Sequence, residues 1–289
     1  MQKHNIIDGK KISQSIIEKL KIEYAEYLIA GGRPACLAII LVGDDAASKI
    51  YIQNKQKAAA VVGMQAQLVE LPSNISENEL LEIIHGLNMD PAISGIIVQL
   101  PLPGHIDKQQ VVSAISPHKD VDGFHPLNMG YLYGPESNKF VPCTALGCLD
   151  LIKSCMPEIA GKNAVVIGRS IIVGRPVAAL LLKEDCTVTI CHSGTKNLAD
   201  ITKRADIVVS AIGKPKYLTK EYFSEQALVI DVGISRIEIG GEVKLCGDVD
   251  FDNVCDHVKY ITPVPGGVGP MTVAYLLVNC FRAAQGQVQ

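Results

Sequence analysis

Residues 164–176 read AVVIGRSIIVGRP, an apolar run that ends at Gly168 and is followed by a second glycine, Gly174. The apolar run predicts a buried strand, and the apolar residues after Gly174 predict a helix. A glycine at the end of a strand lets the backbone approach a pyrophosphate, and the start of the next helix offers free N–H groups to an anion. The spacing departs from GxGxxG, and two glycines here also suit an ordinary turn. Nucleotide binding is the favoured interpretation.

Strands and helices alternate on both sides of this glycine loop. After it, apolar runs predict strands over 187–191, 207–210 and 227–232. Before it, the pattern predicts a helix over 12–29, a strand over 36–42, a helix over 48–62, a strand over 65–71, a helix from a capping box at Ser76 and Glu79 to Asn88, and a strand over 95–100. Such alternation predicts an α/β fold with parallel sheets covered by helices.

The chain has 289 residues, which is enough for two domains. A segment rich in Pro and Gly, 101–134, with one short helical stretch near Val111, separates the two halves, and a helix over 144–155 opens the second. We expect one α/β domain over 1–140 and a Rossmann-like, doubly wound domain over 141–270. A last apolar helix, 271–284, follows the loop 262–270 and need not belong to the domain before it.

The end of the strand over 187–191 bears on the kind of nucleotide. Folds that prefer NAD usually place Asp or Glu there to hold the ribose 2'-hydroxyl, whereas this chain continues with His192, Ser193, Gly194 and Thr195. Arg169, Ser193, His192 and Lys196 can receive a 2'-phosphate, which favours NADP over NAD. Loops 210–213 and 231–234 also end predicted strands with glycine, and they suit either contacts with the nucleotide or tight turns.

Composition excludes several classes of partner. Hydrophobic residues make up 48% of the chain and charged residues 20%, with a formal net charge of -3. This balance predicts a globular protein without the basic field that nucleic acids or anionic membranes attract. The segment 1–11 is polar and no apolar run reaches membrane-spanning length, so we expect a cytoplasmic protein.

Cysteine and histidine patterns give no sign of a metal site. The nine cysteines contain no CxxC pair, and the seven histidines contain no HExxH motif. An odd number of scattered cysteines predicts reduced, mostly buried thiols rather than a disulfide framework. We expect no bound metal.

Tyr51 and Lys55 stand four residues apart in the predicted helix over 48–62, so they share one face. A tyrosine beside a lysine can orient it and relay a proton, although an ordinary solvated pair has the same spacing. Short-chain dehydrogenases also carry YxxxK, but theirs follows the nucleotide loop. Here the motif precedes Gly168 by more than a hundred residues, which argues against that family.

Three further stretches point to another family: IVQLPLP at 97–103, KDVDGFHP at 119–126 and PVPGGVGPMT at 263–272. Together with the Tyr51–Lys55 motif and the glycine loop, they closely resemble the bifunctional methylenetetrahydrofolate dehydrogenase/cyclohydrolase family. The resemblance covers nearly the whole chain in the expected order, and PGGVGPMT is the most specific of the motifs.

The resemblance implies NADP-dependent oxidation of methylenetetrahydrofolate, hydrolysis of the methenyl product, a homodimer, and a cleft between a folate domain and an NADP domain. It implies that Lys55 is the catalytic lysine, Tyr51 orients it and stacks on the folate, Gln99 modulates it, and Asp122 binds the pterin. The folate domain is completed by the terminal helix, 271–289. The resemblance also implies contacts to the folate from Val98, Leu100, Pro265, Gly266 and Gly267, and to the cofactor from Gly168, Arg169, Ser170, Gly174, Ser193, Ile234 and Thr144.

One departure and three alternatives accompany this interpretation. The family usually reads PCTP where this chain has Ala145 after Pro142-Cys143-Thr144, a change that leaves Thr144 in place. No GxxxxGK[ST] loop is present, so an ATP-dependent ligase activity is not expected. A shikimate-dehydrogenase-like enzyme, or an inactive regulator that binds folate or nucleotide, are the alternative functions. For Asp122 alone, the alternative is a carboxylate that caps the turn before Gly123.

Overall fold

The computed structural model describes residues 5–134, 139–239 and 242–286, and within it the chain divides into two compact units. The three-stranded unit contains Gln14–Cys143 and Val273–Gln289, and the five-stranded unit contains Met1–Ser13 and Thr144–Thr272. The division falls inside the two long helices α1 (Gly9–Ile29) and α10 (Val268–Ala284), so each unit is built from two separate pieces of chain.

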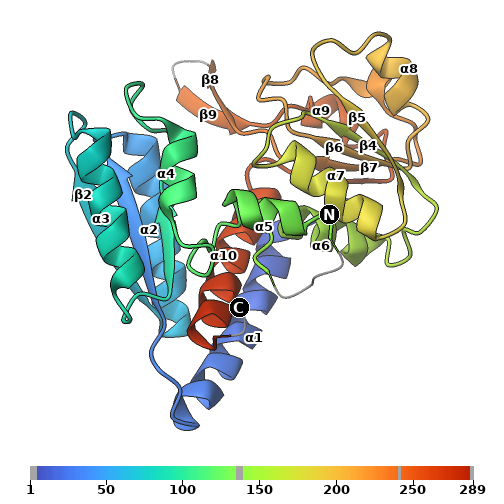
Figure 1. Cartoon of the computed structure of the whole chain (residues 1–289). Coiled ribbons are helices and arrows are strands. Elements are labelled where there is room, and N and C mark those ends of the chain that lie inside the picture. Colours follow the sequence, from blue (N-terminus) through green and yellow to red (C-terminus); the bar gives the residue numbers. More distant parts are fainter. Residues whose placement is uncertain (1–4, 135–138, 240–241, 287–289) are drawn as a thin grey trace. The chain divides into compact units, whose positions relative to one another are not determined.

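The three-stranded unit has a parallel sheet with the strand order β2-β1-β3, covered by helices (Figure 1). In the central strand, Ile39 is in register with Leu68 of β2 and Ile97 of β3. Besides most of α1 and α10, the elements are β1 (Cys36–Val42), α2 (Ala46–Val62), β2 (Gln65–Leu71), α3 (Glu77–Met89), β3 (Gly95–Val98), α4 (Lys108–Ala114) and α5 (Pro126–Tyr131).

Strand β1 shows why an unbroken apolar run was needed at this position. All seven of its residues are buried. Leu37, Ile39 and Leu41 pack with residues of α1, α2 and α10, whereas Ala38 and Ile40 pack with residues of α3 and α4. Successive side chains of a strand point to opposite faces, so a central strand between two helical layers must be apolar throughout. The predicted buried strand is confirmed.

Local capping sets the ends of the helices next to this sheet. Asp45 begins α2, because its carboxylate accepts a hydrogen bond from the Ser48 N–H at 2.7 Å. Gly63, with φ of +91°, ends the same helix in the left-handed conformation. Ser76 and Glu79 form the predicted capping box of α3. Helix α2 thus begins two residues earlier than the apolar pattern indicated.

The five-stranded unit has an all-parallel sheet with the strand order β10-β7-β6-β4-β5. The chain order reverses between β4 and β6, which makes the carboxyl edge of these two strands the switch point where such sheets bind ligands. The elements are α6 (Cys143–Cys155), β4 (Asn163–Ile167), α7 (Gly174–Lys183), β5 (Thr187–Cys191), α8 (Leu198–Thr202), β6 (Ile207–Ser210), β7 (Leu228–Asp231), β8 (Ser235–Ile239), β9 (Glu242–Cys246), α9 (Phe251–Val254) and β10 (Tyr260–Ile261). The predicted doubly wound α/β class is confirmed.

Some elements lie outside the predicted pattern. Helix α5 falls in a segment that was expected to be a loop, and the antiparallel hairpin of β8 and β9 was not predicted. Pro126 in the first turn of α5 and the Gly240-Gly241 pair in the sequence were the available signals. Helix α10 begins at Val268, so the expected loop over 262–270 is three residues too long; a proline is tolerated in the first turn of a helix.

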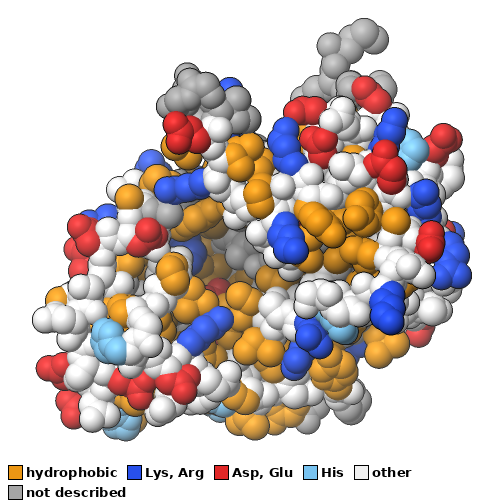
Figure 2. All heavy atoms as spheres, turned by 90° about the horizontal axis from the view of Figure 1, so that it is seen from above, with side chains coloured by type: hydrophobic (Ala, Val, Ile, Leu, Met, Phe, Trp, Pro, Cys, Tyr) orange, Lys and Arg blue, Asp and Glu red, His pale blue; other side chains and the backbone are white. Residues whose placement is uncertain are grey.

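The surface is of mixed charge. Figure 2 shows one face of the molecule, on which Lys and Arg side chains are interspersed with Asp and Glu. Of the described helices, none combines the length and the apolar character that a bilayer crossing requires.

Candidate functional site

Lys55 lies on α2 and meets the end of β3. Its Nζ donates a hydrogen bond to Gln99 Oε1 at 3.0 Å. Gln99 is itself held by two further bonds: its side-chain Nε2 donates to the Leu100 carbonyl at 2.9 Å and its backbone N–H to the Ile40 carbonyl at 2.9 Å. The amide oxygen is therefore directed at the lysine. Tyr51, one turn before Lys55, is 37% exposed and free to present its ring to a ligand.

Burial controls the ionisation of the lysine. It lowers the pKa of Lys55 below its ordinary value, and the negative charge of Asp122 opposes this shift. For Asp122, burial raises the pKa of the carboxyl group, and the positive charge of Lys55 opposes the shift. A low dielectric disfavours the charged form of each group, and the attraction between the two charges opposes that effect. The expected neutral form of Lys55 is thus favoured by its environment.

Asp120, not Asp122, caps the turn before helix α5. The Asp120 carboxylate accepts hydrogen bonds from the backbone N–H groups of Phe124 at 3.1 Å and His125 at 2.7 Å, and from Asn128 Nδ2 at 2.8 Å. Burial raises the pKa of Asp120 to about 7. In the described part of the chain, no hydrogen bond involves the Asp122 carboxylate. The turn-capping alternative for Asp122 therefore applies to its neighbour.

Helix α10 holds the same turn from its other side. Asn279, fully buried on this helix, donates through Nδ2 to the carbonyl oxygens of Val121 at 2.9 Å and Val141 at 3.3 Å. Gly123 adopts φ of +77°, and a Cβ there would lie 2.6 Å from the Pro142 nitrogen. The backbone on both sides of Asp122 is therefore fixed by packing. Sequence reasoning missed both Asp120 and Asn279.

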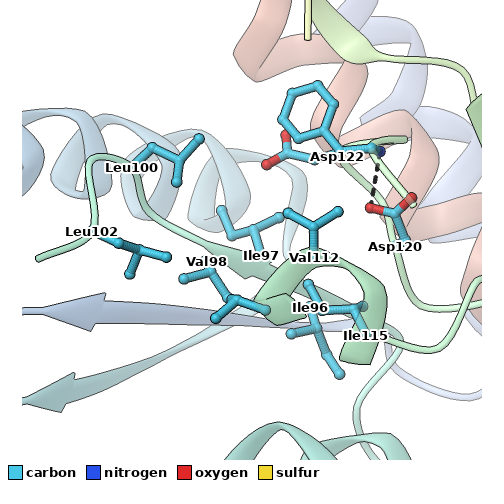
Figure 3. A pocket seen from close by; sticks show the side chains of 11 residues that line it. Ile96, Ile97, Val98, Leu100, Leu102, Val112, Ile115, Asp120 and Asp122 are labelled. Carbon is cyan, nitrogen blue, oxygen red and sulfur yellow. Dashed lines mark hydrogen bonds between the residues drawn. The ribbon is translucent and has the colours of Figure 1, made fainter. Parts of the chain in front are cut away.

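A small pocket lies beside this turn (Figure 3). Its walls are apolar side chains of β3, α4 and the segment after β3, and the Asp122 carboxylate forms part of its lining. Of the residues predicted to bind substrate in this unit, Val98, Leu100 and Asp122 line the pocket, whereas Tyr51, Lys55 and Gln99 do not. Asp122 thus both lines the pocket and interacts electrostatically with Lys55.

The glycine loop follows β4 as predicted, at the switch point of the five-stranded sheet. Gly168 has φ of +126°, and a Cβ there would lie 2.4 Å from the Ala211 carbonyl oxygen at the end of β6. A Cβ on Gly174 would lie 2.1 Å from the Gly168 carbonyl oxygen. Both positions therefore require glycine for close packing of the loop against the sheet. Arg169 and Ser170 are exposed between them.

Ser170 changes the expected chemistry of this loop. Its Oγ accepts hydrogen bonds from the backbone N–H groups of Val173 at 3.2 Å and Gly174 at 3.3 Å. The expectation of free N–H groups at this helix start is wrong for these two residues, because the hydroxyl of Ser170, which precedes both in the chain, accepts their hydrogen bonds. An anion bound here must share these two N–H groups with the Ser170 hydroxyl or displace that hydroxyl from them.

Ser193 lies in the turn directly after β5, beside the glycine loop. The Gly168 N–H donates to the Cys191 carbonyl at 2.8 Å, which places the two segments next to each other. The His192 N–H bonds to Thr195 Oγ1 at 2.9 Å and the Gly194 N–H to His192 Nδ1 at 3.1 Å, so the turn closes on itself without a carboxylate. This arrangement fits a 2'-phosphate near Arg169 and Ser193.

The remaining predicted residues also belong to the five-stranded unit. Ile234 follows β7 and is 46% exposed, and Thr144 Oγ1 lies 3.2 Å from Thr272 Oγ1. The Gly266 carbonyl accepts the Lys10 N–H at 3.0 Å, and Pro265 and Gly267 are its immediate neighbours. These residues lie in a different unit from the lysine site. Ala145, where the family has proline, is buried within α6.

A parallel sheet with a glycine loop at its switch point, together with a unit that carries a half-buried lysine of lowered pKa, is typical of an α/β nucleotide-binding enzyme. Two family models match the chain: "Tetrahydrofolate dehydrogenase/cyclohydrolase, catalytic domain" over residues 7–122 and "Tetrahydrofolate dehydrogenase/cyclohydrolase, NAD(P)-binding domain" over residues 142–288. The chain belongs to the tetrahydrofolate dehydrogenase/cyclohydrolase family, as the resemblance in its sequence implied.

Individual relatives agree with this assignment. The Bifunctional protein FolD of Rickettsia massiliae (strain Mtu5) is 56% identical over 280 residues, which cover 97% of this chain and 96% of that protein. The FolD structure from Campylobacter jejuni matches with a TM-score of 0.93 and 47% identity, covering 97% of this chain and 98% of that one. The Trypanosoma brucei enzyme, solved with NADP cofactor and inhibitor, matches with a TM-score of 0.94, 42% identity and full coverage, 100%, of both chains. A shikimate-dehydrogenase-like enzyme is not favoured.

Proposed function

We propose that this chain oxidises 5,10-methylenetetrahydrofolate to the 5,10-methenyl form with NADP and hydrolyses that product to 10-formyltetrahydrofolate. Membership of the family supports both activities, and the matching Trypanosoma brucei enzyme binds NADP. The single observation that carries the proposal is the Lys55–Gln99 hydrogen bond beside the Asp122 charge. The three-stranded unit, Gln14–Cys143 with Val273–Gln289, would then bind the folate, and the five-stranded unit, Met1–Ser13 with Thr144–Thr272, would bind NADP.

Hydrolysis of the methenyl group is where the lysine acts. Water must lose a proton as it attacks the methenyl carbon, and a ring nitrogen must gain one as the ring opens. A buried amine with a lowered pKa can take the first proton and return it as an ammonium group. Gln99 keeps the Nζ in one place between these steps, and Tyr51 stacks against the folate ring.

Hydride transfer does not require Lys55 to carry a proton. NADP, when bound, would supply the hydride acceptor, and the lone pair of a folate nitrogen would favour departure of the hydride. The chain contributes alignment: Asp122 holds the amino-bearing edge of the pterin through charge-assisted hydrogen bonds, and Val98 and Leu100 contact its apolar face. The family resemblance also assigns folate contacts to Pro265, Gly266 and Gly267.

Arg169 tests the cofactor preference. With methylenetetrahydrofolate as substrate, kcat/KM should be higher for NADP than for NAD, because the turn at Ser193 contains no carboxylate to repel a 2'-phosphate. Arg169→Ala should lower kcat/KM for NADP by about tenfold or more and leave the value for NAD nearly unchanged, since the lost contact is to the phosphate. Arg204→Ala, a change of the same kind at an exposed arginine just before β6, toward the opposite edge of the sheet, serves as the control.

The same assays test the function as a whole. NADPH formation and decay of the methenyl absorbance are followed together after mixing the protein with methylenetetrahydrofolate and either cofactor. A clear preference for NAD contradicts the proposed cofactor. A protein that binds folate and NADP without turning either over supports the regulator instead.

We further propose that the enzyme is a cytoplasmic homodimer. Val243 and Leu245 lie two residues apart on β9 and so share one face, with exposed fractions of 68% and 40%. Exposed apolar faces and unpaired strand edges favour association with a second copy. Sedimentation should give twice the 31.0 kDa of the chain, and Val243→Lys should weaken the dimer. A single 31.0 kDa species at micromolar concentration contradicts the proposal.

The nine free cysteines are consistent with the cytoplasm.

A further inference from the structure

Two carboxylates lie buried together at the carboxyl edge of the five-stranded sheet. Asp231 is the last residue of β7 and Asp248 follows the hairpin of β8 and β9; their exposed fractions are 3% and 0%. Asp231 Oδ1 accepts the backbone N–H of Asp248 at 3.0 Å. Within the described residues, neither carboxylate forms an ion pair. Such groups are costly to bury unless hydrogen bonds satisfy them, so their partners are informative.

The partners of the Asp248 carboxylate come from the last residue of β6 and the loop that follows it. Its Oδ2 accepts hydrogen bonds from Ser210 Oγ at 2.9 Å and the Ile212 N–H at 2.8 Å, and its Oδ1 accepts one from the Lys214 N–H at 2.9 Å. Three donors from five consecutive residues therefore converge on one side chain. The conformation of the loop over 210–214 depends on this carboxylate.

Asp231 holds the neighbouring loop in the same way. Its Oδ1 accepts the Gly233 N–H at 3.0 Å, and its Oδ2 accepts the Val249 N–H at 2.8 Å. A Cβ on Gly233 would lie 2.2 Å from Asp248 Oδ1, and one on Gly247 would lie 1.9 Å from Asp231 Oδ2. Burial raises the pKa of Asp231 to about 7 despite these bonds. The two side chains thus join the loops after β6 and β7 in one packed network.

These two loops lie side by side next to the glycine loop, because β6 pairs with β4 and β7 pairs with β6, at the edge where the cofactor is expected. The Ala211 carbonyl of the first loop packs directly on Gly168, and Ile234 of the second is exposed. We propose that Asp248 and Asp231 are positioning residues for the cofactor, which hold the loops over 210–214 and 231–234 in the conformation that receives NADP. This inference rests on the proposed function, and it assigns a role to two buried carboxylates that act through the loops they hold.

Asp248→Asn tests the inference, because it keeps the shape of the side chain and removes its charge. One oxygen is replaced by an NH₂ group, which cannot accept from a backbone N–H. The KM and directly titrated Kd for NADP should rise by about tenfold or more, whereas the cyclohydrolase rate, measured with methenyltetrahydrofolate and no NADP, should stay within about twofold. Ser210→Ala, which loses one of the three hydrogen bonds, should raise both constants by a smaller factor.

Asp206→Asn is the matched control. The Asp206 carboxylate accepts the Asn163 N–H at 2.8 Å at the amino edge of the same sheet, so its loss should leave NADP binding unchanged. The inference is overturned if Asp248→Asn lowers the melting temperature while the NADP constants stay the same, or if the cyclohydrolase rate falls by the same factor as NADP affinity. Should Asp248→Asn fail to fold, unchanged NADP constants in Ser210→Ala overturn it. Absence of NADP binding in the unaltered protein would instead count against the proposed function.

Discussion

Replacing Lys55 with methionine should nearly abolish the hydrolysis of methenyltetrahydrofolate and leave appreciable dehydrogenase activity. General acid/base groups contribute roughly 10² to 10⁴-fold to such proton transfers, so the cyclohydrolase rate should fall by about that factor. Hydride transfer needs no proton carrier and should lose only what depends on orientation. Methionine keeps the apolar stem of the side chain. With methylenetetrahydrofolate and NADP, the methenyl product should accumulate, which its absorbance reports directly.

Two further measurements sharpen this result. Lys57→Met, an exposed lysine two residues further along α2, should change neither activity. In the unaltered enzyme the cyclohydrolase rate should rise with pH as Lys55 loses its proton, with a midpoint below the ordinary lysine value of 10.5 because burial lowers its pKa. Equal and severe loss of both activities in Lys55→Met, with normal folate binding, would show that the lysine acts in the hydride step instead.

Asp122→Ala should impair both activities, because both need the folate held in one pose. Loss of a charge-assisted contact to a bound substrate costs roughly 10² to 10³-fold in kcat/KM when it also misaligns the reacting atoms. Asp122→Asn keeps an acceptor oxygen but not the charge, so its kcat/KM values should lie between those of the unaltered enzyme and those of Asp122→Ala. The rates are measured with methylenetetrahydrofolate and with methenyltetrahydrofolate separately.

The control for Asp122 is a carboxylate that only caps a turn. Asp90 Oδ1 accepts the Ala92 N–H at 2.8 Å in an exposed turn of the same unit, so Asp90→Ala should affect stability with normal kinetics in the folded protein. If Asp122→Ala behaves like Asp90→Ala, or if only the KM for NADP changes, the assignment of Asp122 to the pterin is wrong.

Local patterns predicted the sheet framework well. The strands at Thr187–Cys191 and Ile207–Ser210 have the predicted bounds. A short strand bounded by turn residues is a local pattern, so the sequence around it is enough to predict where it begins and ends. Helix α5 was not predicted, since six residues carry too little periodicity to distinguish a helix from a loop. The hairpin of β8 and β9 was not predicted, because its strands alternate apolar and polar residues, whereas the strands of a buried parallel sheet are continuous apolar runs.

The site was harder to predict from periodicity alone. Helical spacing placed Tyr51 and Lys55 on one face, but the partner of the lysine, Gln99, lies 44 residues away and came from the resemblance to a family. Asp120 and Asp122 stand two residues apart, and only the folded turn distinguishes the one that caps it. Asp248 receives its hydrogen bonds from residues 34 to 38 positions earlier, a separation that no local pattern encodes.

The place of Asn279 on the last helix affects the order in which the folate site can mature during synthesis. Strand β1, helix α2 and the turn that carries Asp122 leave the ribosome early, but Leu276, Leu277 and Phe281 of α10 belong to the same core, and Asn279 ties down Val121 beside that turn. The larger piece of the five-stranded unit, Thr144–Thr272, with all five strands of its sheet, is translated in between. A growing chain can therefore form the five-stranded sheet before helix α10 has been synthesised. The proposed folate site, which needs α10 for its core, is then the last part of the fold to be completed.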